Sequence, residues 1–331
     1  MKKIFLTGIN GFLGSHTAVT LVKEGYRIVG LARQRKFPAL LKDLPVEYCI
    51  GDLVHPHTYQ TAMRGCQAVI HTAALASFGA KDPQDYYRIN LEGTKHLLET
   101  AEKNGIIRFV YVSTRGVFGT AQNPVDSDES TVKKNLEQFD AYIRSKCMAH
   151  DAVVRCAQMG TMSCVLLCPT AMIGSNDERP TPAGKILSSL LQGKVRVYMD
   201  GGINIVDVED VAAACVTALD KGKSGESYIL GRENLKLYEL FRRLSQISGA
   251  PLPKIKVPFG PAYLGSFAAE GLSKLMGKAP FITPKKIISL YKDYSYCSSN
   301  KSVKELGVAY TPTEETLYKI MQWFKESFQY V

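Results

Sequence analysis

The sequence predicts an α/β protein with a doubly wound parallel sheet and a smaller C-terminal α/β lobe that is partly interwoven with it. Two observations carry this prediction. Short apolar runs alternate with helical patterns through the first half of the 331-residue chain, as in parallel sheets that helices cover on both faces. After Pro169 the alternation loosens, and prolines divide the remaining sequence into shorter segments.

Six apolar runs have the length and the boundaries of strands. They cover residues 4–6, 26–31, 46–50, 68–71, 108–112 and 163–167. Helical spacing of apolar residues predicts helices at 16–25, 84–104, 139–158, 183–192, 208–220, 235–248 and 314–328. Ligands of such sheets bind at the carboxyl ends of the strands, so the polar residues that follow the runs are the first candidates for a binding site.

A glycine-rich turn follows the first run, with the spacing Gly-x-x-Gly-x-x-Gly. The first glycine of such a turn permits a tight bend, the second lets the backbone approach a pyrophosphate, and the third lets the next helix pack closely. The N-terminus of that helix favours anionic phosphates. The dinucleotide contacts expected here are Gly8, Asn10, Gly11, Phe12, Leu13 and Gly14.

The position of this turn predicts the domain organisation. Residues 1–168 are expected to form a dinucleotide-binding domain, and parts of 195–230 are expected to return to it. Residues 169–331 are expected to form the substrate-binding lobe. No internal repeat or low-complexity tract interrupts this division.

Composition narrows the class of protein. Hydrophobic residues make up 45% of the chain and charged residues 22%, which is ordinary for a globular protein. The eight cysteines show no framework spacing, which predicts reduced thiols and a cytoplasmic enzyme without a metal site. No secretory signal and no apolar segment of about 18 residues is recognisable.

The formal net charge of +10 indicates an anionic cofactor, substrate or surface. No basic stripe with interleaved aromatic residues occurs, so nucleic acid is not expected as a partner. Four lysines lie in or near the apolar residues 260–276, namely Lys274, Lys278, Lys285 and Lys286. A solvated face is the default interpretation there, and weak contact with a membrane surface is the alternative.

The residues after the second run predict which dinucleotide is bound. An acidic residue at this place binds the ribose hydroxyls of NAD, whereas an arginine meets the 2′-phosphate of NADP. Arg33 stands there, and Arg35 and Lys36 add to the positive field. NADP(H) is therefore expected, with NAD(H) as the alternative. Asp52, after the third run, is expected either to accept from the adenine amino group or to cap a turn.

The segment Tyr142-Ile-Arg-Ser-Lys146 predicts proton chemistry. Residues four apart share a helix face, and an ammonium group beside a phenol lowers the phenol's pKa from its usual value of about 10. Tyr142 would then act as acid or base, while Lys146 would also hold the nicotinamide ribose. Thr114, after the fifth run, would donate a hydrogen bond to the substrate oxygen. His71, after the fourth run, is expected to be structural.

Taken in chain order, these motifs resemble the extended short-chain dehydrogenase/reductase family. They are Thr7-Gly8-x-x-Gly11-x-x-Gly14, Gly51-Asp52-Leu53, His71-Thr72-Ala73-Ala74, Tyr111-Val-Ser-Thr114, Tyr142-x-x-x-Lys146 and Cys168-Pro169-Thr170. The resemblance covers nearly the whole chain. It is strongest to the dihydroflavonol-4-reductase-like and NAD-dependent epimerase branch.

The resemblance implies a Rossmann domain and a bound nicotinamide dinucleotide, with Thr114, Tyr142 and Lys146 as catalysts. It implies a supporting role for Asn90, a homodimer, and further dinucleotide contacts at Leu53, Thr72, Ala73, Ala74, Pro169 and Thr170. The sequence departs from the family pattern twice. The catalytic hydroxyl belongs to a threonine, or to Ser113 if the register differs by one residue. Arg115 replaces a small residue and argues against sugar dehydration.

We therefore predict an NADP-dependent oxidoreductase that reduces the carbonyl group of a small, hydrophobic ketone or aldehyde to an alcohol. Two other functions stay open. A nucleotide-sugar epimerase would use the same three residues and show no net redox change. A non-catalytic NADP-sensing protein would keep the fold without turnover, since fold alone does not establish activity.

Overall fold

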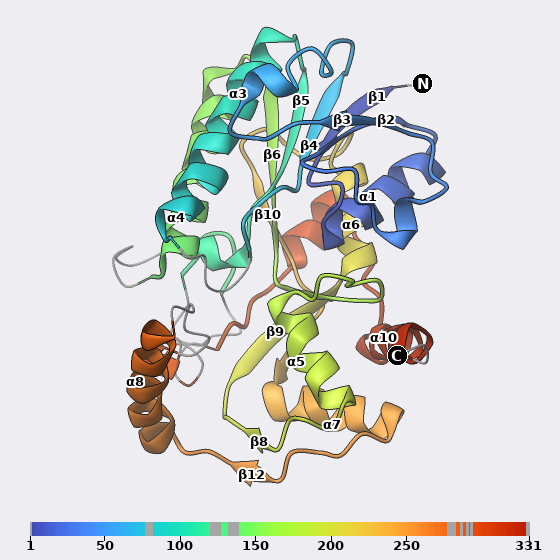
Figure 1. Cartoon of the computed structure of the whole chain (residues 1–331). Helices are drawn as coiled ribbons and strands as arrows, with labels where there is room; N and C mark the ends of the chain where they lie inside the picture. Colours follow the sequence, from blue (N-terminus) through green and yellow to red (C-terminus); the bar gives the residue numbers. More distant parts are fainter. Residues whose placement is uncertain are drawn as a thin grey trace.

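Seven parallel strands form the central sheet of the computed structural model, in the order β10-β6-β5-β4-β1-β2-β3 (Figure 1). They are β1 (Lys3–Thr7), β2 (Arg27–Ala32), β3 (Val46–Ile50), β4 (Ala68–His71), β5 (Arg108–Val112), β6 (Ser163–Pro169) and β10 (Ser227–Leu230). The strand order reverses at β1, which pairs with β2 on one side and β4 on the other. Ligands of open α/β sheets bind at the carboxyl ends of the strands at such a point. The structure describes residues 2–76, 82–119, 127–131, 139–276, 283–284, 287–288, 291 and 294–328.

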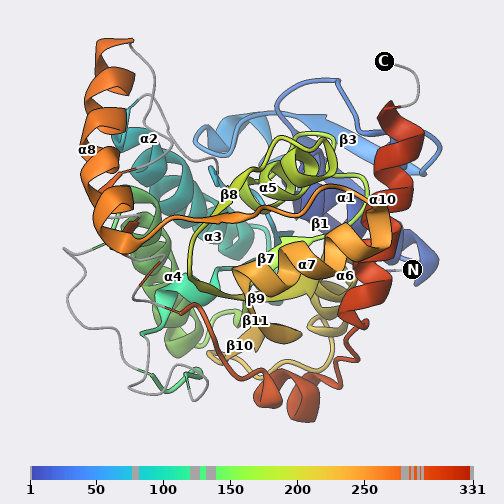
Figure 2. The same cartoon turned by 90° about the horizontal axis from the view of Figure 1, so that it is seen from below.

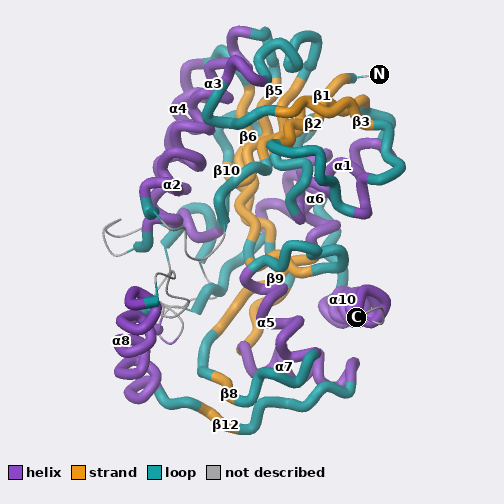
Figure 3. The backbone as a smooth tube through the Cα atoms, viewed as in Figure 1, coloured by secondary structure: helices purple, strands orange, loops and turns teal. Residues whose placement is uncertain are grey.

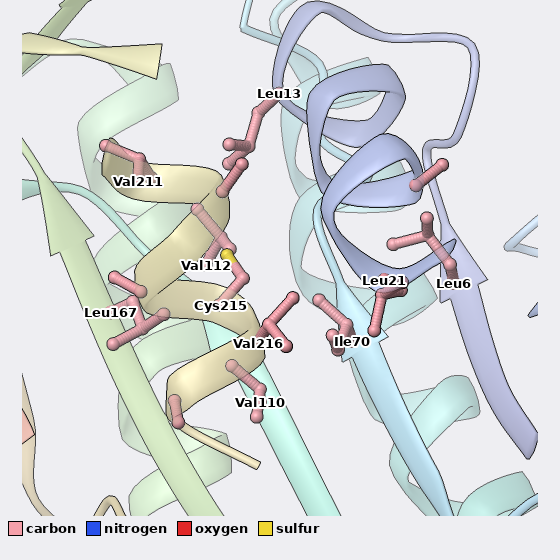
Figure 4. Close-up of a cluster of buried hydrophobic side chains, with 14 of the residues drawn as sticks. Leu6, Leu13, Leu21, Ile70, Val110, Val112, Leu167, Val211, Cys215 and Val216 are labelled. Atoms are coloured by element: carbon pink, nitrogen blue, oxygen red, sulfur yellow. The ribbon is translucent and has the colours of Figure 1, made fainter. Parts of the chain in front are cut away.

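Two helices, α1 (Phe12–Lys23) and α6 (Val208–Thr217), cover one face of the sheet. Side chains alternate between the two faces of a strand, and alternate strand residues on this face are almost fully buried. Figure 4 shows the resulting cluster, in which strand residues meet the two helices: Leu6, Ile70, Val110, Val112 and Leu167 with Leu13, Leu21, Val211, Cys215 and Val216. This packing fixes where the first turn of α1 points.

The other face is covered by α3 (Gly93–Lys103) and α4 (Ala141–Met159). The helix that leads into α3 begins as α2 (Gln84–Tyr86) and continues through a π-helical segment, Tyr87–Glu92. The intervening strand residues, among them Phe5, Phe109 and Tyr111, pack against this layer. Helices on both faces of a parallel sheet confirm the doubly wound fold class that the sequence predicts.

The second half builds a smaller lobe around two short sheets. One sheet has the order β11-β9-β7 and the other pairs β12 with β8. The strands are β7 (Ala171–Ile173), β8 (Val197–Tyr198), β9 (Gly202–Asp207), β11 (Glu233–Lys236) and β12 (Ile255–Lys256). The helices are α5 (Pro182–Leu191), α7 (Leu237–Ser248), α8 (Phe259–Leu275) and α10 (Thr313–Phe328), with a π-helical segment at Ser302–Leu306. Figure 2 shows this lobe from below, with α8 standing at its side.

The two parts are interwoven, because α6 and β10 come from the second half of the chain and belong to the central sheet. β10 pairs with β6 in parallel, and α6 packs against α1. The backbone tube in Figure 3 follows the chain from β9 up into α6 and β10. The predicted return of parts of 195–230 thus has a physical basis. The division at residue 168 remains our proposal.

Some predicted boundaries differ from the structure. The first helix starts at Phe12 rather than at residue 16, because Gly11 has extended dihedral angles and stands as its N-cap. The predicted helix 84–104 contains the π-helical segment, and periodicity alone does not reveal that change of hydrogen bonding. β7, β8, β11 and β12 have two to four residues, too few to show a period.

Among the residues described, no helix combines the length and the apolar character needed to cross a membrane. Three of the lysines singled out in the sequence, Lys278, Lys285 and Lys286, lie outside the described residues, and so does the side chain of Lys274.

Gly14 offers a test of the predicted close packing of α1. A methyl group on Gly14 would overlap the carbonyl oxygen of Gly8, whereas one on Gly265 of α8 would meet no neighbour within 4 Å. We expect Gly14→Ala to lower the free energy of unfolding by about 1–3 kcal/mol through overpacking. Gly265→Ala should leave it unchanged or raise it by up to about 1 kcal/mol, because alanine is the better helix former.

Urea denaturation of both variants measures the difference. Equal free energies of unfolding for the two variants would show that the turn and α1 do not depend on the missing side chain at Gly14.

Candidate active site

The glycine turn connects the end of β1 to α1 and folds closely on itself. Gly8 has a φ of +72°, in the left-handed region that favours glycine. The backbone N–H of Gly11 donates to the carbonyl of Gly8 at 2.8 Å, and Gly14 passes the same carbonyl so closely that only a hydrogen fits in place of a side chain. The turn therefore aims the first turn of α1 at the carboxyl edge of the sheet.

The N-terminus of α1 has the character of an anion site. Its N-cap, Gly11, has no side chain to accept from the first N–H groups, and no acidic residue stands in the first turn. The side chain of Leu13 points into the core, and Phe12 packs edge-on against His16 with ring centroids 5.5 Å apart. The N-terminus of α1 thus offers its backbone N–H groups to a ligand, an arrangement that fits a dinucleotide pyrophosphate.

Asn10 joins the glycine turn to the basic loop after β2. Its amide Nδ2 donates to the carbonyl oxygens of Gln34 at 3.3 Å and Lys36 at 2.9 Å. Arg33 and Lys36 are exposed. On the far side of the same loop, the N–H of Ala39 donates to the carboxylate of Glu178 at 2.7 Å. The structure therefore holds the predicted 2′-phosphate residues beside the predicted pyrophosphate cradle.

The residues after β3 are positioned by a turn. The Asp52 carboxylate accepts from the N–H of Val54 at 3.1 Å, which is the turn-capping role. Its contact with an adenine amino group stays a prediction. Leu53 is buried against Gly93 of α3. Leu53 can therefore offer a ligand only its backbone.

The loop after β4 is tied to the end of β1. The Thr72 hydroxyl donates to the carbonyl of Thr7 at 2.7 Å, and the N–H of Ala73 donates to the Thr7 hydroxyl oxygen at 3.3 Å. Ala74 is exposed. The two loops that flank the reversal of strand order thus form one unit at the edge of the sheet, where the predicted contacts Thr72 and Ala73 meet Gly8.

His71 lies beneath this unit and is fully buried. Its Nδ1 lies 2.7 Å from the Thr7 hydroxyl, and its Nε2 lies 3.0 Å from the Thr94 hydroxyl. Thr94 donates to the carbonyl of Asn90 at 2.6 Å, so it accepts from Nε2–H, and the network assigns that tautomer. Burial, assisted by the charge of Lys146, lowers the pKa of His71 to about 3. The His71 ring is thus neutral, with a hydrogen bond at each nitrogen, as expected of a structural histidine.

Thr114 and Ser113 occupy different environments at the end of β5. The Ser113 hydroxyl is buried, 3.0 Å from Nδ1 of His150. The Thr114 side chain is half-buried, and its oxygen accepts from the N–H of Gly116 at 3.2 Å, which leaves its hydroxyl hydrogen free to donate elsewhere. Of the two hydroxyl groups, Thr114 is the better candidate. The unexpected Arg115 is buried and donates from Nη2 to the carbonyl of Tyr296 at 2.8 Å.

Tyr142 stands in the first turn of α4, which Asp140 caps by accepting from the N–H of Ile143 at 2.9 Å. Ile143 packs against Gly116, so the turn after Thr114 and the start of α4 are in contact. Tyr86 packs edge-on against the Tyr142 ring at 6.0 Å between centroids. The expected lowering of the Tyr142 pKa is wrong for this structure. Burial, together with the charge of Asp140, raises the pKa of Tyr142 to about 12.

Lys146, the expected source of support for a phenolate, is itself only 2% exposed. Its Nζ donates to the carbonyl of Val112 at 2.9 Å and lies 4.4 Å from the centre of the Tyr111 ring. The amine thus bonds to the end of β5, and burial lowers its pKa to about 7. A lysine that is half neutral near pH 7 gives a neighbouring phenol little electrostatic support.

Asn90 connects the loop after β4 to α4. Its Oδ1 accepts from the N–H of Leu75 at 2.8 Å, and its Nδ2 donates to Leu75 O at 3.3 Å and to Ser145 Oγ at 3.0 Å. Ser145 in turn donates to the carbonyl of Tyr142 at 2.7 Å. Asn90 lies in the π-helical segment, and such segments occur often at functional sites.

Sequence reasoning missed two of these residues. Asp140 precedes the Tyr142 helix and carries a recognisable N-cap signal. Ser145 gave no signal, because its role depends on Asn90. That residue lies 55 residues earlier in the chain, on a neighbouring element.

Pro169 ends β6 beside β10, and Thr170 follows it. The N–H of Thr170 donates to the carbonyl of Leu230 at 2.9 Å, whereas its Oγ1 is buried without a hydrogen-bond partner. A buried hydroxyl of this kind calls for a partner. It fits the predicted contact with the nicotinamide carboxamide.

Elsewhere, a surface cavity of about 530 Å³ lies between the C-terminal ends of α5, α7 and α10, lined in part by Leu191, Pro251 and Phe324.

Comparison with known proteins identifies the class. The chain belongs to the NAD dependent epimerase/dehydratase family, whose model matches residues 4–231. It is an NAD(P)-dependent oxidoreductase of the extended short-chain dehydrogenase/reductase type.

The individual relatives point in the same direction. A "putative dihydroflavonol 4-reductase" from Synechocystis is 34% identical over 97% of this chain and 94% of its own length. "Sterol demethylase protein B" from Methylococcus capsulatus is 28% identical over 97% of this chain and 98% of its own length. The crystal structure of gox2253 superposes with a TM-score of 0.88 at 32% identity, over 99% of both chains.

The buried Lys146 predicts how stability depends on pH. Burial lowers the pKa of Lys146 from 10.5 to about 7 in the folded chain. At a pH between these two values, this lysine carries a proton in the unfolded chain that it lacks in the folded chain. The contribution of Lys146 to the free energy of unfolding therefore rises with pH. The rise is up to about 1.4 kcal/mol per pH unit between about pH 7.5 and 8.5. We expect the free energy of unfolding of the wild type to rise over this window relative to Lys146→Met.

Denaturant titrations at three pH values measure this difference, with Lys23→Met, an exposed lysine, as the control. Parallel profiles for the wild type and Lys146→Met would show that the amine keeps its ordinary pKa.

Proposed function

We propose that the protein is an NADPH-dependent reductase of hydrophobic ketones or aldehydes. The observation that carries the proposal is the arrangement at the edge of the sheet. There Thr114, Tyr142 and Lys146 stand within one packed unit of β5 and α4, beside the glycine turn and its basic loop.

The residues of this site fit a nicotinamide dinucleotide. The glycine turn has room for phosphates where side chains would overlap the backbone, and the Thr170 hydroxyl is buried and unpaired. Gly8 to Gly14 would hold the pyrophosphate, Arg33 and Lys36 the 2′-phosphate, and Lys146 the nicotinamide ribose. NADPH, when bound, supplies the hydride.

The protein residues would supply the proton. A raised pKa keeps the Tyr142 hydroxyl protonated at neutral pH, so Tyr142 is ready to donate its proton to the oxygen of a carbonyl that is being reduced. The Thr114 hydroxyl would donate a hydrogen bond to the same oxygen and stabilise its developing charge. Tyr142 and Thr114 would thus act on the same oxygen atom of the substrate.

The relatives support the choice of substrate class. Two of them carry names that refer to a dihydroflavonol and to a sterol, which are polycyclic and largely apolar. A nucleotide-sugar epimerase remains the second candidate, because the family description includes epimerases. Such an enzyme must take the hydride back in every cycle. A reductase instead releases its oxidised dinucleotide and takes up new NADPH. The exposed Arg33 favours NADPH and therefore the reductase.

We expect the wild type to consume NADPH in the presence of hydrophobic ketones, with sterol ketones and aromatic ketones in the test panel. Tyr142→Phe should lower kcat by at least about 100-fold, the lower end of the usual effect of a general acid. NADPH affinity should change little, because the ring and its packing remain. Loss of NADPH absorbance measures kcat, and calorimetry measures affinity.

Tyr318→Phe, on the exposed surface of α10, is the matched control and should behave as the wild type. A Tyr142→Phe variant with most of its activity would remove Tyr142 as the proton donor. No turnover on the panel, together with interconversion of nucleotide sugars, would replace the reductase by the epimerase.

Substitution of Arg33 tests the preference for NADPH over NADH. We expect Arg33→Asp to weaken NADPH binding by about 10- to 100-fold, the worth of a charge-assisted hydrogen bond, and to leave NADH binding unchanged or stronger. Arg27→Asp, exposed at the opposite end of β2, is the control. Equal loss of NADPH and NADH affinity, or no loss at all, would contradict a 2′-phosphate contact at Arg33.

A further inference from the structure

Helix α8 is oriented against the usual rule, with its large apolar side chains outside and its small side chains inside. Leu264, Leu272 and Leu275 are 70%, 60% and 87% exposed. Ser266 is buried, and it shares a side of the helix with residues that are only partly exposed, namely Ala262, Ala269 and Ser273. A surface helix of a globular protein normally turns its apolar stripe towards the core. The outward face of α8 therefore calls for a partner.

Exposed apolar residues are concentrated in this part of the molecule. Of the 13 large apolar side chains that are exposed among the described residues, seven belong to α8, the residue after it, or the β8–β12 pair. We call these seven the α8 surface: Val197, Ile255, Leu264, Phe267, Leu272, Leu275 and Met276. Val197 and Ile255 are register partners on neighbouring strands. Figures 1 and 3 show α8 and β12 at the same end of the molecule, joined by a short connection.

The N-terminal half of α8 is stiffened by an aromatic ladder. Phe259 stacks on Tyr263 at 5.5 Å, Tyr263 meets Phe267 at 5.2 Å, and Tyr291 packs edge-on against Phe259 at 5.4 Å between ring centroids. The Tyr291 hydroxyl also donates to the carbonyl of Val257 at 2.5 Å. The helix thus stands in place without burying its outward face.

We propose that the α8 surface docks on the surface of an anionic phospholipid bilayer. An apolar helix face flanked by cations is the pattern of a helix that lies in the lipid interface. The cations on β8, β12 and their flanks are Lys194, Arg196, Lys254 and Lys256, all exposed. Asp200 is the acid paired with one of them, Lys256. The chain as a whole carries +10, and positive charge near a membrane attracts anionic lipids.

A second copy of the chain fits this surface less well. The large apolar residues of the α8 surface lie largely along one helix, and a second copy docked there would bring the exposed cations of β8, β12 and their flanks towards the same cations of its partner. A 17-residue helix is about 25 Å long, and α8 is not among the helices that could cross a bilayer, since the described residues contain none. Lying on the bilayer is the mode that its length and face allow.

The purpose of docking rests on the proposed function, although the binding itself does not. An apolar carbonyl compound partitions into lipid, so an enzyme held at the bilayer surface meets it at high local concentration. The site would then draw its substrate from the membrane and its NADPH from water.

Vesicle flotation tests the proposal with the full chain. We expect the wild type to float with vesicles of phosphatidylglycerol and phosphatidylcholine, with a partition coefficient at least about tenfold above that for phosphatidylcholine alone. Binding should fall in about 0.5 M NaCl, because salt screens the charges. Leu264→Asp with Leu275→Asp should lower the partition coefficient by at least about tenfold.

The control is Ile107→Asp with Met159→Asp, two side chains that are 70% and 69% exposed far from α8, and it should bind as the wild type. Circular dichroism confirms that each variant is folded. Absence of wild-type binding, or equal binding of the α8 variant, would overturn the proposal. A dimer that the α8 variant dissociates, without vesicle binding, would assign the surface to a second copy.

NADPH turnover with a water-soluble ketone separates this proposal from the proposed function. Turnover without vesicle binding would overturn only the docking surface. Vesicle binding without turnover on any carbonyl compound would support the docking surface and leave the reductase without support.

Discussion

The close passage of Gly14 over the carbonyl of Gly8 is the constraint on which the site depends. It fixes the angle at which the chain leaves β1 and enters α1, and so brings a helix N-terminus without side-chain caps to the edge of the sheet. Asn10, within the same turn, holds the basic loop after β2. Thr7, directly before the turn, holds the loop after β4. One backbone contact thus positions the elements expected to bind the dinucleotide.

A continuous chain of hydrogen bonds joins this turn to the candidate catalytic helix. It runs from Thr7 through His71 and Thr94 to Asn90, and from Asn90 through Ser145 to the first turn of α4. Every side chain in it is buried, where hydrogen bonds are costly to leave unmade. The glycine turn and the first turn of α4 are therefore joined by one polar network, which explains why a neutral His71 belongs at its centre.

The sequence was sufficient for six of the seven strands of the central sheet and for most helices, because buried parallel strands and amphipathic helices leave clear patterns, as at residues 68–71 and 108–112. Short strands such as β8 have no period to detect. The site was predicted as a set of motifs, whereas the state of its groups was not. Lys146 bonds to Val112 rather than supporting a phenolate, and desolvation depends on the packed surroundings of both side chains, which their four-residue spacing does not specify.

The most direct test of the central claim follows the hydride itself. NADPH labelled with deuterium at nicotinamide C4 is incubated with the protein and a hydrophobic ketone, and the product is analysed by mass spectrometry and NMR. We expect an alcohol that carries one deuterium on its carbinol carbon, with matched loss of NADPH. Retention of all deuterium on the nicotinamide, while a nucleotide sugar changes its configuration, would contradict it.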